Sequence, residues 1–304
     1  MNVHTFRCSV EVFMEIAELV QNTIHHTRHL EWFRWVRWLL VPLGGYCVLV
    51  AIVTCSQRSI MYHPPHLSAA ELKPLADRNR LLPWTNHAGV RIGWYRPTPG
   101  GEAVANVLIA HGNGGSAVGR EYIIDPLQTA FNANAYVLEY PGYVDRPGTL
   151  SKESILAAGE EAFGLAARNG PVVLVGESLG TGVCCYLAAK FPNQVRGVVL
   201  LVPYDNTVNA ARSRFSWLPV RWLLRDKFTS DEWLPQYHGP VVFVVAEQDE
   251  VLPPYLGKRL FDLYAGPKQL EFCVGAGHWI GANRPPEFWA RAWHFFEESK
   301  VIGQ

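Results

Sequence analysis

The stretch that decides the fold is residues 171–180, PVVLVGESLG, in which an apolar run passes directly into Gly176-Glu177-Ser178-Leu179-Gly180. The apolar run predicts a buried strand, and residues 181–190 predict a buried helix. A sharp turn from strand to helix holds the intervening serine exposed, and the flanking glycines let the two elements come close. The stretch therefore predicts that Ser178 is a nucleophile at the carboxyl end of a strand.

Other apolar runs of strand length recur through the C-terminal two thirds of the chain, with helical stretches between them. They cover residues 90–95, 105–110, 135–139, 197–202, 240–246 and 269–274. The clearest helix runs from Ser151, which can cap it, to Asn169, and Gly170 ends it. This alternation predicts an α/β fold with a mostly parallel central sheet covered by helices on both faces. Residues 204–239 interrupt the alternation and predict a small helical cap over the carboxyl ends of the strands.

Two later loops supply the partners that a serine nucleophile needs, namely a base for its proton and an acid that orients the base. His278 lies in a glycine-rich loop after the last predicted strand, and we interpret it as the base. Glu247, Asp249 and Glu250 follow the strand at 240–246, and each of these carboxylates is a candidate for the acid. The chain order serine, acid, histidine, with each residue just beyond a strand, is typical of one known triad arrangement.

The glycine-rich turn His111-Gly112-Asn113-Gly114-Gly115 follows the strand at 105–110, and its amides can face the site. We assign the oxyanion hole to the backbone N–H groups of Asn113 and Leu179. His111 precedes the turn, and we expect it to hydrogen-bond and pack the loop. The competing interpretation is a dinucleotide-binding loop with Glu139 on the ribose, which leaves the serine turn and the late histidine unexplained.

The N-terminal part has the composition of a membrane segment. Residues 39–55 carry no charge, and this length is near the lower limit of the ~17 to 25 residues that cross a bilayer. Tryptophans alternate with Arg34 and Arg37 just before it, as in a headgroup layer, and the prolines and glycines within it are tolerated in lipid. We predict three parts: an amphipathic and juxtamembrane segment 1–38, a transmembrane helix 39–55 and a folded domain 56–304. More arginines precede the span than follow it closely. This excess favours a single-pass anchor with the catalytic domain on the non-cytoplasmic side.

Within residues 1–38, Val12, Phe13, Ile16, Leu19, Val20 and Ile24 recur at helical spacing. This pattern predicts an amphipathic helix. His25 and His29 are spaced as a metal-binding pair, but no third ligand is nearby in the sequence, so we interpret them as solvated.

Composition and cysteine spacing exclude several other classes of function. The chain has 304 residues with 27 basic and 27 acidic side chains, so no net charge would attract nucleic acid. Its six cysteines form no CxxC pair, and neither a disulfide framework nor a metal site is expected. Cys184, Cys185 and Cys273 lie in apolar elements, where we expect them to pack as small hydrophobic residues.

Together these motifs resemble the α/β-hydrolase superfamily over almost all of residues 56–304. The matching blocks are residues 111–115, Glu139-Tyr140-Pro141-Gly142-Tyr143, residues 176–180, Asp249-Glu250-Val251-Leu252-Pro253 and Gly277-His278. Within this superfamily the chain is similar to small-capped, N-terminally anchored serine hydrolases, whose cap the segment Trp217-Leu218-Pro219-Val220 resembles. The resemblance implies Asp249 as the acid, with Asp205 in reserve. The turn at 145–148 departs from the small-residue turn of the family.

The resemblance implies a membrane-anchored serine hydrolase that cleaves carboxylic ester or thioester bonds through an acyl-enzyme on Ser178, with His278 as base and Asp249 as acid. It implies no metal and no organic cofactor. The substrate would be a small-molecule or lipid-like acyl ester, because the domain sits at a bilayer. The alternatives are a serine aminopeptidase-like amidase or peptidase, and a catalytically inactive hydrolase-fold scaffold for a membrane partner.

Overall fold

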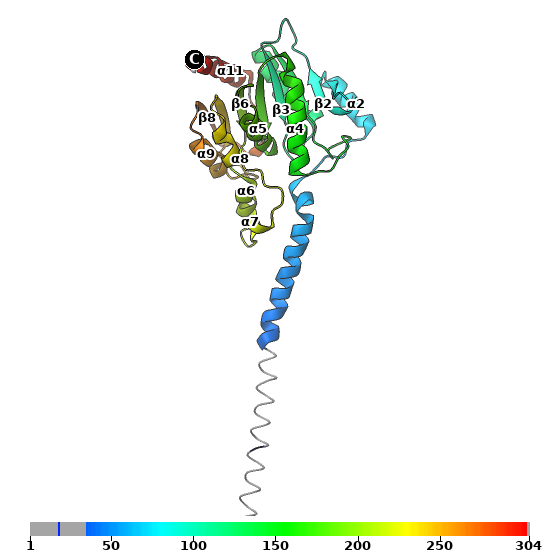
Figure 1. The fold of residues 1–304 in the computed structure, drawn as a ribbon, viewed down its shortest axis with the longest axis vertical. Coiled ribbons are helices and arrows are strands. Elements are labelled where there is room, and N and C mark those ends of the chain that lie inside the picture. The colour runs from blue at the N-terminus through cyan, green and yellow to red at the C-terminus, as the bar shows by residue number, and fades with distance from the viewer. Residues whose placement is uncertain (1–17, 19–34, 303–304) are drawn as a thin grey trace, which may run out of the picture. The chain divides into compact units, whose positions relative to one another are not determined.

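The computed structural model describes residue 18 and residues 35–302, and the chain divides into two compact units, Met1–Ser56 and Gln57–Gln304. A helix of 27 residues, Trp35–Met61, is long and apolar enough to cross a membrane by length and composition (Figure 1). It extends beyond both ends of the predicted span 39–55, because the flanking residues continue the helix after the uncharged stretch has ended. The predicted amphipathic helix, apart from Glu18, and the N-terminal histidines lie outside the described residues.

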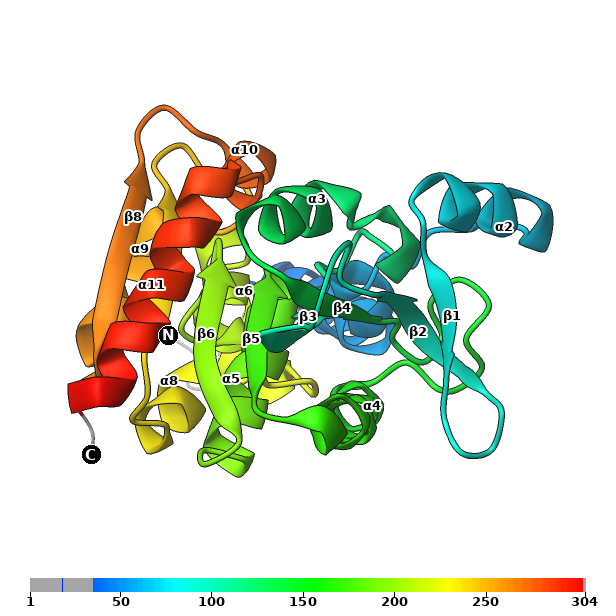
Figure 2. The same cartoon turned by 90° about the horizontal axis from the view of Figure 1, so that it is seen from above.

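The second unit is built on an eight-stranded sheet with the order β1-β2-β4-β3-β5-β6-β7-β8 (Figure 2). The strands are β1 Leu82–Thr85, β2 Arg91–Arg96, β3 Ala105–Ala110, β4 Ala133–Leu138, β5 Val172–Glu177, β6 Val195–Leu201, β7 Val241–Ala246 and β8 Lys268–Cys273. Strand β2 runs antiparallel to β1 and β4, and every pair from β4 to β8 is parallel. The predicted mostly parallel sheet is confirmed. The sequence did not predict β1, which is short and contains Pro83.

Helices cover both faces of the sheet. They are α2 Ala69–Arg78, α3 Glu121–Ala130, α4 Lys152–Ala166, α5 Leu179–Lys190, α9 Pro254–Leu263, α10 His278–Ala282 and α11 Pro286–Ile302. Helices α4, α5 and α9 pack on one face and α3 and α11 on the other (Figure 2). Successive residues of a strand point to opposite faces, so Leu108 joins the first layer whereas Val107 and Ile109 join the second.

Helix α4 begins after Ser151, as the sequence indicates, and ends at Ala166, before the predicted Asn169. The hydroxyl of Ser151 accepts a hydrogen bond from the backbone N–H of Ser154 at 3.2 Å. After Ala166 the chain continues as a 3-10 turn to Asn169, and Gly170 has φ +127°, a conformation that favours glycine. The N-cap hydroxyl and the terminal glycine therefore act as expected at the two ends of this helix.

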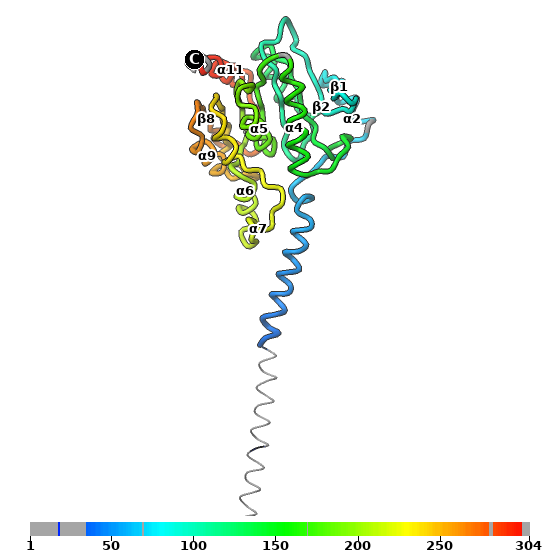
Figure 3. The backbone as a smooth tube through the Cα atoms, in the orientation of Figure 1, coloured from blue at the N-terminus to red at the C-terminus, as the bar shows by residue number. Residues whose placement is uncertain are grey.

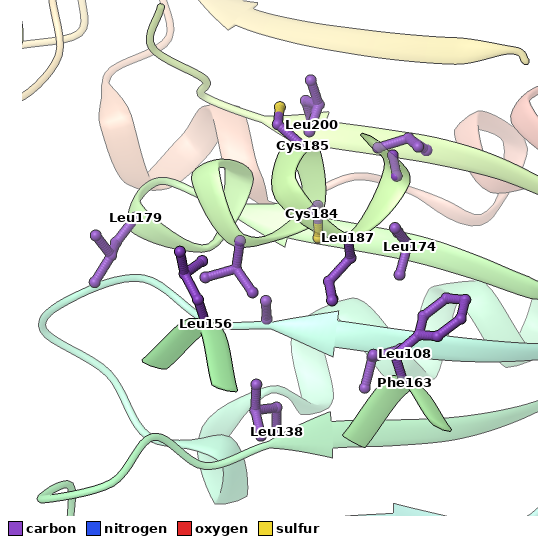
Figure 4. Packing of buried hydrophobic residues seen from close by; sticks show 14 of the residues in the cluster. Leu108, Leu138, Leu156, Phe163, Leu174, Leu179, Cys184, Cys185, Leu187 and Leu200 are labelled. Carbon is purple, nitrogen blue, oxygen red and sulfur yellow. The ribbon is translucent and has the colours of Figure 1, made fainter. Parts of the chain in front are cut away.

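Buried cysteines pack among leucines in the layer between the sheet and α5 (Figure 4). Cys184 and Cys185 are fully buried, and burial raises the pKa of both thiols. Cys273 is half-buried in β8, and Arg284 donates to its sulfur at 3.1 Å. The two helix cysteines are packing residues, as predicted, whereas Cys273 also has a polar contact.

Residues 204–239, which we call the cap segment, connect β6 to β7 through short helices (Figure 3). These are α6 Thr207–Arg214, α7 Val220–Leu223, α8 Ser230–Trp233 and the 3-10 turn Leu234–Gln236. Asn206 caps α6, because its side-chain oxygen accepts from the N–H of Asn209 at 2.8 Å. The segment leaves the sheet at the carboxyl end of β6, which is also the edge where β5 and β7 end.

Candidate active site

Ser178 lies in the sharp turn between β5 and α5 and has φ +51° and ψ −115°. A residue other than glycine rarely adopts a positive φ, and such strain persists only where the surrounding structure holds it. Strand β5 runs to Glu177, two residues beyond the predicted end, so that Gly176 belongs to the strand. The predicted strand–turn–helix around the serine is present.

The two glycines of this turn occupy positions where a side chain has no room. A Cβ on Gly176 would lie 2.6 Å from the carbonyl oxygen of Gly180 and 2.7 Å from Cα of Thr181. A Cβ on Gly180 would lie 2.0 Å from the carbonyl oxygen of Ala110, at the end of β3. Both glycines are therefore required, the first for the tight turn and the second for the approach of α5 to β3.

The glycine-rich loop after β3 lies beside the serine. A Cβ on Gly112 would be 3.4 Å from Cβ of Ser178. The carbonyl of Asn113 accepts from the hydroxyl of Tyr143 at 2.8 Å, and its side-chain amide donates to the carbonyl of Met61 at 2.8 Å. Leu179 is the first residue of α5, and the first N–H groups of a helix have no partner within it. The N–H groups at the start of α5 are thus backbone donors next to the serine.

His278 is paired with Asp249. Nδ1 of the imidazole lies 2.7 Å from Oδ2 of Asp249, and both side chains are almost completely buried. The other carboxylate oxygen accepts from the backbone N–H groups of Val251 and Leu252 at 2.8 and 2.7 Å. One carboxylate oxygen is therefore held by the backbone, and the other faces Nδ1 of the imidazole. This pairing directs Nε2 away from the aspartate.

The other carboxylates of the loop bind backbone atoms. Glu247 accepts from the N–H of Gly275 at 2.8 Å, and Glu250 accepts from the N–H of His278 at 3.4 Å. They contact the loop that carries the histidine, whereas Asp249 contacts the imidazole itself. Among the three carboxylates that follow β7, Asp249 is the one that contacts the imidazole of His278.

The reserve acid Asp205 is held elsewhere. Its buried carboxylate accepts from the N–H of Asn206 at 2.7 Å and the amide of Asn209 at 2.6 Å, and lies 3.4 Å from Nε of Arg259. Burial raises the pKa of Asp205, and these donors partly oppose the rise. In the described part of the chain, these partners belong to the cap segment and α9, and the histidine is not among them.

His111 and Glu139 form a buried pair under the glycine loop. One ring nitrogen of His111 lies 2.7 Å from the carbonyl of Gly112, and the other lies 3.1 Å from the carboxylate of Glu139. The second oxygen of that carboxylate accepts from the N–H of Ala117 at 3.0 Å. His111 thus packs and bonds the loop, as expected. Glu139 is enclosed and paired, so it has no freedom to bind a ribose as the dinucleotide interpretation requires.

A second buried network, which the sequence did not reveal, joins the serine turn to the glycine loop. Glu177 accepts from the N–H of Gly112 at 3.3 Å and from the hydroxyl of Tyr122 at 2.7 Å. Nε of Arg120 lies 3.2 Å from the same carboxylate. Arg120 passes so close to Gly115 that a Cβ there would lie 1.3 Å from a guanidinium nitrogen. Burial raises the pKa of the Tyr122 hydroxyl, which keeps it protonated as a donor.

Within residue 18 and residues 35–302, no group of three or more His, Cys, Asp or Glu side chains is arranged to hold a metal ion. The described residues supply Ser178 in a strained turn after β5 and, after β8, the imidazole of His278 held by Asp249. Such a combination is suited to acyl transfer.

Comparison with known proteins supports the fold. A family model described as the alpha/beta hydrolase fold matches residues 105–232, which include β3, the glycine loop and the serine turn. The mostly parallel sheet, the serine turn after β5 and the histidine after β8 agree with this match. The chain has the alpha/beta hydrolase fold.

Relatives with curated descriptions extend the comparison. An uncharacterized protein of Mycobacterium tuberculosis is 29% identical over 283 residues, covering 87% of this chain and 97% of its own length. The lysophosphatidylserine lipase ABHD12 of Rattus norvegicus is 27% identical over 206 residues, covering 60% of this chain. The chain spans 50% of the length of that lipase.

Solved structures share the fold. An esterase of Pyrococcus furiosus, Pf2001, has a TM-score of 0.58 at 14% identity and covers 79% of this chain and 98% of its own. Est1E from Butyrivibrio proteoclasticus, solved with ferulic acid, has a TM-score of 0.54 at 16% identity and covers 70% and 97%. The fold, the family match and the hydrolase relatives together support hydrolase activity for this chain.

Proposed function

We propose that this chain is a membrane-anchored serine hydrolase that cleaves carboxylic ester or thioester bonds. Ser178 is the nucleophile, His278 the general base and acid, and Asp249 the residue that orients the imidazole. The backbone N–H groups of Asn113 and Leu179 form the oxyanion hole. The observation that carries the proposal is the 2.7 Å contact between His278 Nδ1 and Asp249 Oδ2, at the edge of the sheet where the strained Ser178 follows β5.

The reaction follows from these groups. The Ser178 hydroxyl attacks the acyl carbonyl while His278 Nε2 takes its proton, and the carbonyl electrons move to an oxyanion held by the two N–H groups. The intermediate then collapses, the acyl–oxygen or acyl–sulfur bond breaks, and the imidazolium protonates the departing alcohol or thiol. Water, deprotonated by the same imidazole, attacks the acyl-enzyme and releases the acid and the free serine. The Asp249 carboxylate stabilises the imidazolium in both halves.

The membrane anchor is the helix Trp35–Met61. Its length and composition support a span, and the arginines that precede it favour an N-terminus in the cytoplasm with the catalytic unit on the other side. Digestion of sealed vesicles with a protease tests this orientation. In vesicles whose outer surface is the cytoplasmic side, protease added outside is expected to leave the unit Gln57–Gln304 intact. Cleavage of this unit by that protease would reverse the assignment.

Substrates with an acyl chain are favoured because the enzyme would meet them in the bilayer. One relative is named a lysophosphatidylserine lipase, so single-chain phospholipids belong in the substrate panel beside simple esters and thioesters. Turnover of short p-nitrophenyl esters without turnover of aminoacyl amides would support an esterase. The reverse preference would favour the aminopeptidase-like alternative.

The nucleophile is tested with a fluorophosphonate probe, which reacts with activated serines. The full-length protein is expected to be labelled, Ser178→Ala is expected to lose the label, and Ser213→Ala is the matched control. Ser213 lies in α6 with its hydroxyl bonded to the carbonyl of Ala210, outside the proposed machinery. Equal labelling of the protein and Ser178→Ala would refute the assignment, and no labelling of either would favour the inactive scaffold.

A further inference from the structure

One stretch of the cap segment is rich in exposed arginine and tryptophan. Residues 207–225 contain four arginines and no acidic residue, although the whole chain has no net charge. Trp222 of α7 is 82% exposed and Trp217, just before α7, is 48% exposed. We give the name Arg/Trp face to the exposed arginines and tryptophans of this stretch, which are Arg212, Arg214, Trp217, Arg221, Trp222 and Arg225.

The positive charge of the Arg/Trp face is not neutralised locally. Within residues 35–302, none of Arg212, Arg221 and Arg225 forms an ion pair. The next acidic residue along the chain, Asp226, is buried and already paired with Arg58 at 3.0 Å. Exposed guanidinium groups without a carboxylate nearby leave a field that attracts anions, and guanidinium matches phosphate geometry.

The same segment is bonded to Gln57 and Arg58, which lie in the last turns of the helix Trp35–Met61. The Gln57 amide donates to the carbonyl of Leu223 at 3.3 Å and accepts from the N–H of Arg225 at 2.7 Å. Arg58 makes two hydrogen bonds to Asp226, at 3.0 and 3.2 Å. All these residues belong to the second unit, and Gln57 follows directly on the uncharged residues of the helix. These bonds hold the end of α7 and the residues that follow it beside Gln57 and Arg58, the first residues of the second unit.

The Arg/Trp face also adjoins the candidate active site. Arg214 donates to the carbonyl of Glu250 at 2.6 Å, one residue beyond the orienting acid Asp249. The hydroxyl of Tyr204, at the start of the cap segment, lies 3.5 Å from the carbonyl of Leu179. A surface bound to lipid at this place would bring the site next to the bilayer.

We propose that the Arg/Trp face rests on the bilayer surface and binds anionic phospholipid headgroups, so that acyl substrates reach Ser178 from the lipid. Its arginines bind lipid phosphates, and Trp222 sits among the headgroups, where its amphipathic ring is favoured. This inference rests on the proposed anchor and hydrolase function. It adds a second contact with the membrane, the lipid charge that this contact prefers, and the side from which the substrate comes.

The contact is tested by fluorescence quenching on the full-length chain in nanodiscs. Cys8, Cys47 and Cys55 are replaced by alanine, and bimane is attached through Trp222→Cys. The matched control carries the label through Glu102→Cys in the loop before β3, at the opposite ends of the parallel strands. The nanodiscs contain phosphatidylcholine with either no anionic lipid or about 30% phosphatidylglycerol, a composition that gives a negative surface potential. Nitroxide attached to the lipids is the quencher.

We expect lipid-borne nitroxide to quench the label at 222 and not at 102, more strongly with anionic lipid. About 1 M salt should weaken the effect, because the screening length falls to about 3 Å. The pair Arg221→Glu and Arg225→Glu should abolish the anionic-lipid dependence and lower turnover of a lipid-borne ester at least about fivefold, the effect of one basic residue near such a surface. Turnover of a water-soluble ester should not change. The control pair Arg78→Glu and Arg168→Glu alters charge equally and should have neither effect.

Equal quenching at both positions, or none at 222 while the chain stays in the nanodisc, would overturn the proposal. A label at 222 that is shielded from aqueous iodide but not quenched by lipid would assign the face to a protein partner and also overturn it. A chain that leaves the bilayer at alkaline pH would refute the anchor itself. If the Arg221→Glu and Arg225→Glu pair loses turnover of both esters while the label at 222 is still quenched by lipid, only the delivery of substrate from the lipid is refuted. These failures can therefore be told apart.

Discussion

The substitution Gly180→Ala tests the geometry around the serine most directly. The added Cβ would lie 2.0 Å from the carbonyl oxygen of Ala110, 2.5 Å from its carbonyl carbon and 2.9 Å from the carbonyl oxygen of His111. These three atoms are backbone, so no side chain can rotate to relieve the contact. The first turn of α5 and the end of β3 must separate by roughly 1 Å, and a displacement of that size in a site can cost about 100-fold in rate.

Two measurements follow from this displacement. Overpacking of this kind costs about 1–3 kcal/mol, and each kcal/mol lowers the Tm of a domain of this size by about 2–4 °C. We therefore expect the Tm of Gly180→Ala in detergent to fall by about 3–10 °C. Its kcat for a p-nitrophenyl ester should fall about 100-fold, because the Leu179 N–H and the glycine loop no longer face the same oxyanion.

Gly164→Ala is the matched control. Gly164 lies on the exposed side of α4, and a Cβ there meets no atom within 4 Å. The same chemical change should raise stability by about 0.4–1 kcal/mol, because alanine has less conformational freedom to lose, and should leave kcat unchanged. If Gly180→Ala retains the Tm and the kcat of the parent, the close approach of α5 to β3 is not required and the reasoning is refuted.

Three further predictions concern single side chains. Asp249→Asn should lower kcat by about four orders of magnitude, because the imidazole loses its orienting carboxylate, whereas Asp205→Asn should retain turnover. The pKa of Asp205 is raised above 3.8 by burial, so the folded state binds more protons and stability falls as the pH rises past 3.8. In Tm measurements Asp205→Asn should lack this component, so its stability relative to the parent should increase with pH across that window. Asn113→Ala removes the 2.8 Å bond to the carbonyl of Met61 and should lower kcat about tenfold or more with KM unchanged, because the glycine loop shifts.

Each of these predictions has an opposite outcome. Full turnover in Asp249→Asn together with loss in Asp205→Asn would transfer the orienting role to Asp205. A stability difference between Asp205→Asn and the parent that does not vary with pH would mean that Asp205 has an ordinary pKa. A rise in KM at constant kcat in Asn113→Ala would show that the loop binds substrate and does not position the oxyanion donors.

Much of the fold was predictable because its signals are local. The strand at 105–110 has the predicted bounds, and the helix after Ser151 and the serine turn follow from neighbouring residues in the chain. Apolar periodicity, cap residues and glycines act within a few positions, so a linear pattern records them. Strand β1 escaped notice because its four residues include a proline and leave no alternating pattern.

Choices between equivalent side chains depended on the tertiary structure. Residues 247, 249 and 250 are all carboxylates in one loop, and only the packing of β7 beside β8 brings Asp249 to the imidazole of His278. Arg120 gives no signal in the sequence that it would be buried against Glu177, because its partner is distant in the chain. The amino-acid order thus specifies which chemical groups follow each strand, whereas the sheet order and the loops between strands decide which of these groups meet. The physical reason is that hydrogen bonds between remote residues depend on positions within a few tenths of an ångström, which no periodic pattern encodes.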